Sequence, residues 1–478
     1  MMGKLNLQVL DPDLLNAVQV IAGLVKEAGG RALMVGGSVR DLLSGERRVK
    51  DVDLEVFGLE PKRLQEVIGQ DFEFDACGLS FGVLKIKHID IDVSLPRRES
   101  KRGVGHRGFL IDSDPTLSIA EAASRRDFTI NAMYYDPLAE VFEDPYGGVE
   151  DLKNRVLRHV SPKFVEDPLR VLRGMQFIAR FGLTPAPETV EICHQVTMED
   201  LPPERLFEEW AKLLTKGVAI SRGLTFLRET GWVRYFPELE CLIGCEQDPQ
   251  WHPEGDVWNH TCLCLDAFAR RRKERQTAER ERGLEPLPGN EDLIVGLAVL
   301  CHDFGKPATT RFERGHIRSL GHDTAGVEPT RSFLRRLTNE ERILKEVPPL
   351  VAGHMQPFSL WKAHAGDAAI RRLALKVGRI DRLIRVAHAD DEGRPPECRG
   401  GTSVGEDLRW LEETAERLRI AAEVPRPIFM GRDLIALGYK PSPKFKKWLD
   451  ACFEAQLDGV FSDHAGALAY FRAQFGTP

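Results

Sequence analysis

The sequence lacks the marks of a secreted or membrane protein. Its longest clearly apolar run, residues 293–301, is too short to span a bilayer, and residues 1–13 contain no hydrophobic core of a signal peptide. The nine cysteines include no Cys-x-x-Cys pair, so we expect reduced thiols rather than a zinc knuckle. We therefore expect a cytoplasmic protein with no membrane partner, whose close cysteine pairs are core thiols: Cys241/Cys245 and Cys262/Cys264.

An excess of positive charge is also missing. The net charge is −7, which excludes a globally basic nucleic-acid binder, so any RNA contact must come from local patches. Two stretches supply such patches, residues 94–107 and 270–282, each with a net charge of +4. The first stretch is rich in charge and poor in apolar residues, so it should be mobile. We interpret the second as a solvated helix or a flexible excursion.

Residues 33–58 carry the first chemical signature. A short apolar strand leads into Gly36 and Gly37, a brief helix carries Arg40, and a second strand bears acids at alternate positions. Because strand side chains alternate, these acids share one face: Asp51, Asp53 and Glu55. Two carboxylates two residues apart can hold a pair of divalent ions. The glycines let the backbone approach a triphosphate, and Arg40 can hold one of its oxygens.

Two further motifs carry arginine beside aspartate. The first, Arg125-Arg126-Asp127, precedes an apolar segment, and taken alone it is explained by a capped helix start with an ion pair. The second lies in residues 164–182, for which the spacing predicts a helix. Residues three apart line one helix face, and here they are Asp167, Arg170 and Arg173. A surface ion-pair ladder is the plain explanation, and base recognition is the functional one.

A carboxylate beside a guanidinium offers a hydrogen-bond acceptor next to a donor. Cytosine and adenine present an amino group next to a ring-nitrogen acceptor, so both bases match this arrangement. Uracil and guanine present a carbonyl next to an N–H, and both contacts then clash or stay unpaired. Asp167 and Arg170 can therefore select C and A without a nucleic-acid template.

The region after residue 248 carries an ordered set of histidines and aspartates. His260 stands at the head of a helical run, and His302-Asp303 ends an apolar helix before Gly305-Lys306. Helices can converge such side chains on one metal ion. The set is completed by His322, His354 and Asp390.

The head motifs, in this order, resemble the nucleotidyltransferase signature of the polymerase-beta superfamily. V-G-G-x-V-R-D resembles its class II branch, which holds the tRNA CCA-adding enzymes and bacterial poly(A) polymerases. The resemblance implies that Asp51 and Asp53 are catalytic and bind two Mg²⁺ ions. It also implies that the triphosphate is gripped by Gly36, Gly37 and Arg40.

R-R-D-F-T-I-N-A-M resembles the second motif of this class, which implies that Arg126 contacts the incoming nucleotide and that Asp127 lies near the ribose. The next helix begins with E-D-x-x-R, which resembles the family's base-selecting motif. The nucleotide-binding residues implied there are Asp167, Arg170 and Arg173. The chain departs from the family at Gln176, where a further basic residue is common.

The later set, H…HD…D with H-D-x-G-K, resembles the HD phosphohydrolase superfamily. The resemblance implies a site for Mg²⁺ or a divalent transition metal with the ligands His260, His302, Asp303 and Asp390. It further implies phosphate contacts, or a second ion held by the two histidines, at Lys306, His322 and His354. In some bacterial CCA-adding enzymes such a domain follows the helical neck and removes 2′- or cyclic phosphates.

The motifs predict an α+β protein. Its length of 478 residues suggests several domains, and its composition, 42% hydrophobic and 29% charged, is that of a soluble globular protein. We expect four parts: a mixed-sheet nucleotidyltransferase head (residues 1–150), a helical neck and body with the nucleotide-selecting helix (151–245), a helical HD domain (246–395) and a helical tail (396–478).

The predicted function is template-independent addition of C, C and A to the 3′ end of tRNA, with tRNA, CTP and ATP as partners. A second, phosphohydrolase activity is predicted for the HD domain. The alternatives are a poly(A) polymerase, an enzyme that adds only CC or only A, an HD phosphohydrolase with a nucleotide-sensing head, and a non-catalytic RNA-binding scaffold. No basic insertion follows Asp53 and the tail is not basic, which favours CCA addition over a poly(A) polymerase. The sequence sets no oligomeric state.

Overall fold

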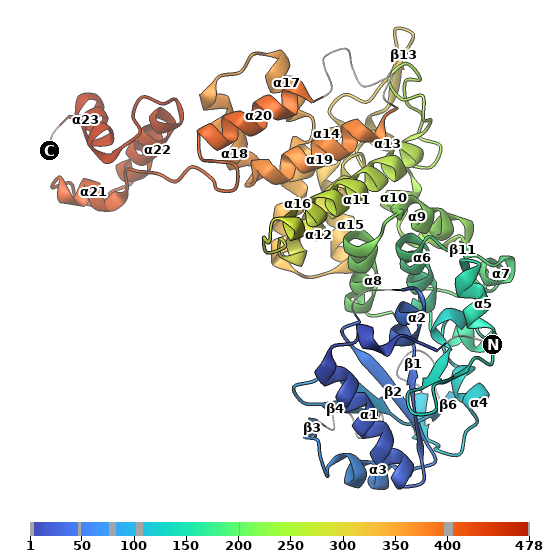
Figure 1. The fold of residues 1–478 in the computed structure, drawn as a ribbon. Helices are drawn as coiled ribbons and strands as arrows, with labels where there is room; N and C mark the ends of the chain where they lie inside the picture. Colours follow the sequence, from blue (N-terminus) through green and yellow to red (C-terminus); the bar gives the residue numbers. More distant parts are fainter. Residues whose placement is uncertain are drawn as a thin grey trace. The chain divides into compact units, whose positions relative to one another are not determined.

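A computed structural model describes residues 4–45, 49–75, 83–101, 109–199, 201–395 and 405–476 (Figure 1). The chain forms two compact units, whose segments alternate along the sequence. The first unit comprises Met1–Leu213 and Arg222–Tyr235, and the second comprises Leu214–Ser221 and Phe236–Pro478.

The first unit contains a mixed β-sheet, which has seven strands in the described residues, in the order β3-β4-β5-β2-β1-β8-β9. β2 pairs antiparallel with β1 and parallel with β5, so it lies inside the sheet. The strand bounds are β1 (Arg31–Val35), β2 (Val52–Phe57), β3 (Phe74–Asp75), β4 (Val83–Ile86), β5 (Ile91–Ser94), β8 (Tyr134–Asp136) and β9 (Val141–Glu143).

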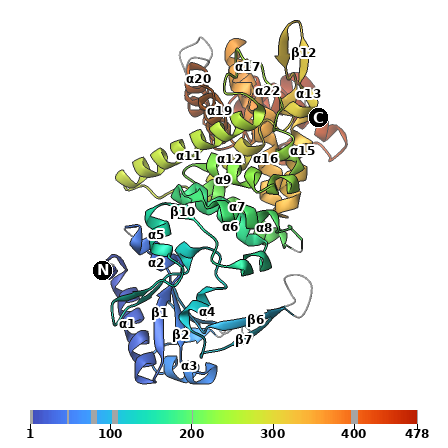
Figure 2. The ribbon, with the colours of Figure 1, turned by 90° about the vertical axis from the view of Figure 1, so that its right-hand side faces the viewer.

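Both faces of this sheet are buried. Met34, Leu54 and Val56 join one hydrophobic cluster with residues of α1 (Pro12–Glu27) and α3 (Pro61–Ile68), and both helices lie along the sheet in Figures 1 and 2. Leu33 and Val35 point the other way, into a second cluster with α4 (Ile119–Ala123). The alternation along β1 and β2 therefore packs α-helices on both sides, as the period of two requires.

A turn at which His88 has a φ of +66° separates β4 from β5. The flanks of the basic stretch at residues 94–107 form β6 (Arg97–Lys101) and β7 (Phe109–Ser113), which pair antiparallel. The predicted mobile centre, residues 102–108, lies outside the described residues.

The rest of the first unit is helical and is joined to the head by aromatic side chains. Phe128 makes edge-to-face contacts with Phe164 and Phe177, with ring centroids 5.5 and 5.9 Å apart. The helices are α2 (Gly37–Leu43), α5 (Gly148–Lys153), α6 (Leu169–Phe181), α7 (Pro187–His194), α8 (Pro203–Lys216) and α9 (Ile220–Glu229). The short strands β10 (Val156–Leu157) and β11 (Thr184–Pro185) pair in parallel.

The second unit is built around α12 (Gly289–Cys301), which is buried along its whole apolar length. It packs against α11 (Val257–Glu281), α16 (Glu341–Gly353) and α19 (Ile380–Gly393). The remaining helices are α10 (Pro237–Glu240), α13 (Lys306–Thr309), α14 (His322–Ala325), α15 (Val327–Leu337), α17 (Gln356–Lys362), α18 (Asp367–Val377) and α20 (Glu406–Arg417).

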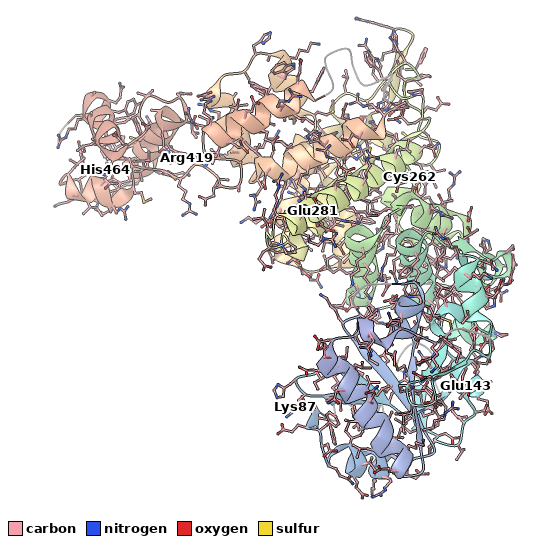
Figure 3. All side chains as sticks on the ribbon, viewed as in Figure 1. Lys87, Glu143, Cys262, Glu281, Arg419 and His464 are labelled. Atoms are coloured by element: carbon pink, nitrogen blue, oxygen red, sulfur yellow. The ribbon has the colours of Figure 1, made fainter. Side chains whose placement is uncertain are left out.

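The second unit also contains a β-hairpin, a group of C-terminal helices and the basic end of α11. A hairpin of β12 (Arg311–Glu313) and β13 (His316–Arg318) follows α13. The last helices, α21 (Gly431–Ala436), α22 (Lys444–Leu457) and α23 (His464–Phe475), share their own hydrophobic cluster around the buried Phe471. The basic stretch at residues 270–282 continues α11 as a helix, as one of the two interpretations held, and ends near Glu281 (Figure 3).

The predicted fold class, a mixed-sheet head followed by a helical body, is confirmed. Among the described residues, no helix has the length and apolarity needed to cross a membrane. The four-part domain division stays a prediction.

A substitution at Gly148 would show how tightly the head is packed. A Cβ at this position would overlap with the carbonyl oxygen of Thr129, and it would lie 2.8 Å from Cγ of Met133. We expect Gly148→Ala to lower the free energy of unfolding by about 1–3 kcal/mol, as overpacking does. Gly23 in α1 has open space around its Cβ position, so Gly23→Ala should raise stability by about 0.5–1 kcal/mol.

The measurement is the denaturant midpoint of both variants beside the wild type. Equal midpoints for the two variants would contradict the packing that the structure gives to residue 148.

Candidate functional site

Gly36, Asp53 and Arg126 converge at the end of β1. Val35 and Asp53 are register partners on neighbouring strands, and Gly36 follows with a φ of +78°, which glycine adopts without strain. A Cβ on Gly36 would lie 3.4 Å from Nη1 of Arg126 and 3.5 Å from Oδ2 of Asp53. Residues predicted from two separate motifs therefore lie close together around the glycine at position 36.

The acidic side of this site gathers three carboxylates. Asp51 directly precedes β2, and Asp53 is the register partner of Asp92 on β5. The pKa of Asp53 is raised: burial of its carboxyl group raises it, Arg126 lowers it, and the carboxylates of Asp92 and Asp51 raise it further. Mutual repulsion of this kind is relieved by divalent cations, which prefer oxygen ligands. Asp51 and Asp53 thus fit the predicted magnesium site.

Glu55, the third acid of the row, is completely buried and is already bound by the protein. Its carboxylate accepts hydrogen bonds from Arg125 (2.9 Å), Arg126 (3.2 Å) and the Tyr134 hydroxyl (2.6 Å). Burial raises the pKa of Glu55, but the two arginines outweigh it and the pKa is lowered. Glu55 therefore positions Arg126 beside Gly36.

A hydrogen-bonded chain connects the head to α6. Arg40 donates to Oδ1 of Asn131 (2.5 Å), and Asn131 donates to Oδ1 of Asp127 (3.0 Å). Arg173 donates to Oδ2 of the same aspartate (2.7 Å). Burial raises the pKa of Asp127, but Arg173 and the hydrogen bonds lower it below its usual value. Asp127 is thus a buried link that holds Arg173 toward the head.

Three guanidinium groups gather over two phenylalanine rings. Arg40 lies 4.5 Å and Arg180 4.9 Å from the ring centre of Phe181, and Arg173 lies 5.3 Å from that of Phe177. Burial and the repulsion of Arg40 lower the pKa of Arg180. Concentrated positive charge of this kind suits a polyphosphate. The sequence reasoning missed Arg180, although its spacing of seven from Arg173 places both on one helix face.

The unusual Gln176 belongs to the same face of α6. It is buried, and its side-chain oxygen accepts a hydrogen bond from Arg180 (3.1 Å). The residue that departs from the family pattern thus positions a neighbouring arginine.

The prediction that Asp167, Arg170 and Arg173 line one helix face is wrong for Asp167. α6 begins only at Leu169, and Asp167 is extended, with φ −122° and ψ 103°. The reason is Pro168, since the residue before a proline is pushed out of the helical region. Asp167 instead pairs through Oδ2 with Arg205 at 3.2 Å.

Arg170 lies in the first turn of α6 and is nearly buried. Its guanidinium donates to the carbonyl oxygens of Lys163 (2.7 Å) and Arg125 (2.5 Å). Two of its five N–H donors are therefore used by backbone, and the side chain is fixed in place.

The second unit brings together the whole predicted HD set. Each histidine ring is oriented through Nδ1 by a hydrogen-bond acceptor: Val299 O for His302, Ser319 O for His322 and Val351 O for His354, all at 2.7 Å, and Glu254 Oε1 for His260 at 2.8 Å. Each Nδ1 therefore faces an acceptor, which directs Nε2 toward the other members of the set. Nε2 of His260 is hydrogen-bonded to Oδ1 of Asp390 at 3.0 Å. Burial lowers the pKa of His302, but the carboxylate of Asp303 outweighs it and raises the pKa to about 10, so a bound cation would take the place of a proton at Nε2. Neutral imidazole held in this way is the form that binds metals.

The Nε2 atoms point toward one another and toward two carboxylates. Nε2 of His322 and Nε2 of His354 are 3.2 Å apart, so two lone pairs face each other. Burial and the neighbouring His302 lower the pKa of His354 to about 4, which keeps its ring neutral. Among the described residues, Nε2 of His302 and Oδ1 of Asp303 are buried without a hydrogen-bond partner. A cation satisfies all of these atoms, so the set fits a metal site.

Asp303 lies between two groups of side chains in this set. The first group contains His260, His302 and Asp390, and the second contains His322 and His354. Its Oδ2 lies 3.2 Å from Nε2 of His302, and its Oδ1 lies 3.4 Å from Nε2 of His322. In the first group, Oδ1 of Asp390 lies 3.0 Å from Nε2 of His260. Burial raises the pKa of each carboxyl, but the facing positive groups outweigh it and both values lie well below normal.

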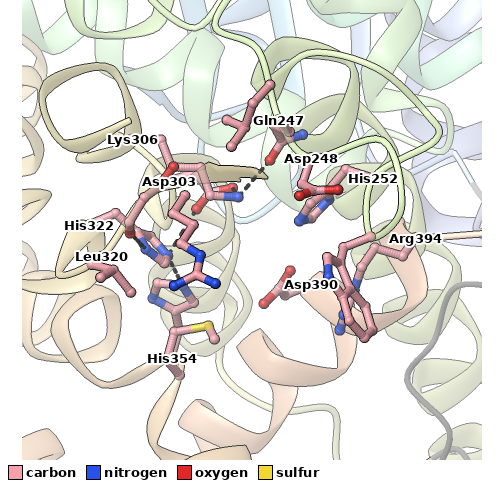
Figure 4. Close-up of a pocket in the computed structure, with 15 residues that line it drawn as sticks. Gln247, Asp248, His252, Asp303, Lys306, Leu320, His322, His354, Asp390 and Arg394 are labelled. Carbon is pink, nitrogen blue, oxygen red and sulfur yellow. Dashed lines mark hydrogen bonds and ion pairs between the residues drawn. The ribbon is translucent and has the colours of Figure 1, made fainter. Parts of the chain in front are cut away.

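The cluster forms the floor of an open pocket of about 410 Å³. Figure 4 shows Lys306, His322 and His354 on one side and Asp390 with Arg394 on the other. Nζ of Lys306 lies 2.7 Å from Oδ2 of Asp303. Trp251 and Arg318 also line the pocket, so it offers cations for a phosphate and an aromatic ring for a base.

The close cysteine pairs are predicted to be core thiols, and this is true of only some of them. Cys262 and Cys264 are buried as expected, whereas Cys241 is exposed, so the core interpretation is wrong for Cys241. Cys264 is more than a core thiol, because its sulfur lies among the HD side chains. The sequence signal was His-x-x-x-Cys, a spacing of four that places Cys264 on the helix face of His260.

Comparisons with known proteins identify the families that the chain resembles. Residues 32–158 match the family described as the poly A polymerase head domain, and residues 182–242 match the probable RNA and SrmB-binding site of polymerase A. The fold is similar to that of a Bacillus stearothermophilus CCA-adding enzyme in complex with CTP, with a TM-score of 0.62, 22% identity, and coverage of 97% of this chain and 99% of that one.

Two relatives extend the match beyond the head. A multifunctional CCA protein of Stenotrophomonas maltophilia (strain K279a) is 37% identical over 399 residues, which cover 80% of this chain and 91% of that protein. A multifunctional CCA protein of Xylella fastidiosa (strain 9a5c) is 34% identical over 381 residues, which cover 76% and 84%. Identity at this level over most of both chains shows that the chain belongs to the family of multifunctional CCA proteins.

Proposed function

We propose that the first unit adds C, C and A to the 3′ end of tRNA, using CTP and ATP. The convergence of Gly36, Asp53 and Arg126 carries this proposal, because it brings a carboxylate that fits metals and an arginine to a stretch of backbone that has no side chain. The names of the relatives and the CTP complex of a structural neighbour support the same reaction.

The chain's own residues supply the triphosphate site. Gly36 leaves room for the phosphates, and Arg126 is fixed beside them by Glu55. The cluster of Arg40, Arg173 and Arg180 adds positive charge nearby along α6. Two Mg²⁺ ions held by Asp51 and Asp53 would supply charge neutralisation and would activate the tRNA 3′-hydroxyl for in-line attack on the α-phosphorus.

Base selection is proposed for Asp167 and Arg170. Oδ2 of Asp167 is held by Arg205 and Oδ1 by the backbone N–H of Leu169, and the side chain is 26% exposed. Arg170 is fixed by two backbone carbonyl oxygens, and its remaining N–H groups would meet the base. Rigid placement of both groups favours discrimination, because neither can turn away from a mismatched base edge.

We further propose that the HD site hydrolyses phosphoesters, with 2′- or cyclic phosphates of nucleotides as the substrate class. His260, His302, Asp303 and Asp390 would hold one divalent ion, and His322 and His354 would hold a second with Asp303. A bound ion supplies a water of lowered pKa as the nucleophile. Lys306, Arg318 and Arg394 line the same pocket and would bind the phosphate.

The decisive assay uses tRNAs that end before CCA, after C and after CC, each with single nucleotides and with CTP and ATP together. Addition that stops after the terminal A supports the proposal. Unlimited A tailing would instead identify a poly(A) polymerase, and addition of only CC or only A would identify a partial enzyme.

Asp53→Asn should lower nucleotide addition by about three orders of magnitude, because the neutral amide no longer holds a divalent ion. The same protein should retain hydrolysis of 2′,3′-cyclic AMP, since the HD site lies in the other unit. Loss of both activities would refute the assignment of nucleotide addition and hydrolysis to separate units.

His302→Ala should give the reverse result. Hydrolysis of 2′,3′-cyclic AMP should fall to background because a ligand is lost, while CCA addition stays within about twofold of the wild type. Treatment of the wild type with a chelator should stop both activities. Hydrolysis that survives both the mutation and the chelator would exclude a metal mechanism.

Asp167→Asn should relax base selection, because the amide presents a donor where the carboxylate presents an acceptor. We expect the ratio of UTP to CTP incorporation to rise by about 10–100-fold. The matched control is Glu204→Gln, an exposed change at the start of α8 that should keep the wild-type ratio. Unchanged selectivity in Asp167→Asn would move base reading elsewhere.

A further inference from the structure

Cys264 is a thiol to which the proposed mechanism gives no role. It lies on α11 one turn beyond His260, and its Sγ is 3.4 Å from Nε2 of that histidine. The ligand atoms of His260, Cys264, His302 and Asp390 all lie within 4.8 Å of one another. Such distances suit four ligands around one ion, each about 2.0–2.3 Å from it.

A second observation points to an ion at the same place. Nε2 of His302, which is 1% exposed, has no hydrogen-bond partner among the residues that the structure describes. Its Nδ1 is bonded to Val299 O, so Nε2 is directed into the group that contains Cys264. A thiol and an imidazole nitrogen gathered with a carboxylate form a set of metal donors.

The backbone is adapted to keep the sulfur there. A Cβ at position 393 would overlap with Sγ of Cys264, so only glycine lets α19 approach α11 at this point. The hydrogen-bond partners of the thiol are Nε2 of His260 at 3.4 Å and the Asp390 carbonyl oxygen at 3.8 Å, so both belong to residues of the same metal-ligand set.

We propose that the Cys264 thiolate is a ligand of the ion in the HD site, together with His260, His302 and Asp390. The proposal rests on the proposed phosphohydrolase site and adds to it a donor atom and a metal preference. Binding breaks the S–H bond, forms a metal–sulfur bond and releases one proton to solvent. With Asp303 from the proposed site, the donors are two nitrogens, two carboxylate oxygens and one sulfur, a set that favours Zn²⁺ or Co²⁺ over Mg²⁺.

Cys262 provides a matched control. It is also buried and lies on α11 two residues earlier (Figure 3), but it belongs to none of the metal-ligand clusters of the described residues. A small buried cysteine that only fills space would behave like Cys262.

The experiment loads metal-free, full-length protein with Co²⁺ and records the near-ultraviolet sulfur-to-cobalt charge-transfer band. The wild type and Cys262→Ser should show the band, and Cys264→Ser should lose it. The carboxylates of the head cannot produce this signal, so it reports on the HD site alone. A band that persists in Cys264→Ser would overturn the proposal.

Two further readouts keep the result unambiguous. If Cys264→Ser fails to fold, the wild type decides, because absence of its band refutes thiolate ligation. Hydrolysis of 2′,3′-cyclic AMP is measured on the same samples. A band without hydrolysis would refute the proposed phosphohydrolase activity and support Cys264 as a ligand. Hydrolysis without a band would support the phosphohydrolase activity and refute Cys264 as a ligand.

Discussion

The buried carboxylate of Glu55 is the interaction on which the first unit depends. It binds Arg125 and Arg126 from inside the sheet, and removal of one partner from such a pair costs about 3–5 kcal/mol. Arg126 thereby reaches Gly36 and Asp53, while the carbonyl oxygen of Arg125 accepts from Arg170. One acidic side chain in β2 thus orients both the arginine of the proposed phosphate site and the carbonyl oxygen that holds Arg170 at the start of α6.

Most of the fold and the candidate residues could be predicted from the sequence, because they lie in short motifs with strong local preferences. The strand–glycine–helix–strand order and the HD set fall into this class. The extended Asp167 was also readable from the proline after it. The carbonyl partners of Arg170 were not, because Lys163 and Arg125 reach it only through tertiary packing. The positions of Arg180 and Cys264 become meaningful only once their neighbours are known.

The two candidate sites separate hard and soft coordination chemistry within one chain. The head offers carboxylates alone, Asp51, Asp53 and the neighbouring Asp92, which suit a weakly held magnesium ion that accompanies a triphosphate. The HD cluster offers imidazoles fixed at Nδ1, which suit a permanently held transition metal. A difference in ligand type allows one cell to supply both metals without exchange between the sites.

The carbonyls that orient His302 and His354 come from the last turns of their own helices. Each accepts from the ring three residues later, at a helix end where backbone oxygens lack a partner within the helix. The tautomer is therefore chosen by local chain geometry and not by the assembled core. An ion bound between α12 and α16 would therefore meet two rings that are each oriented by the helix that carries them.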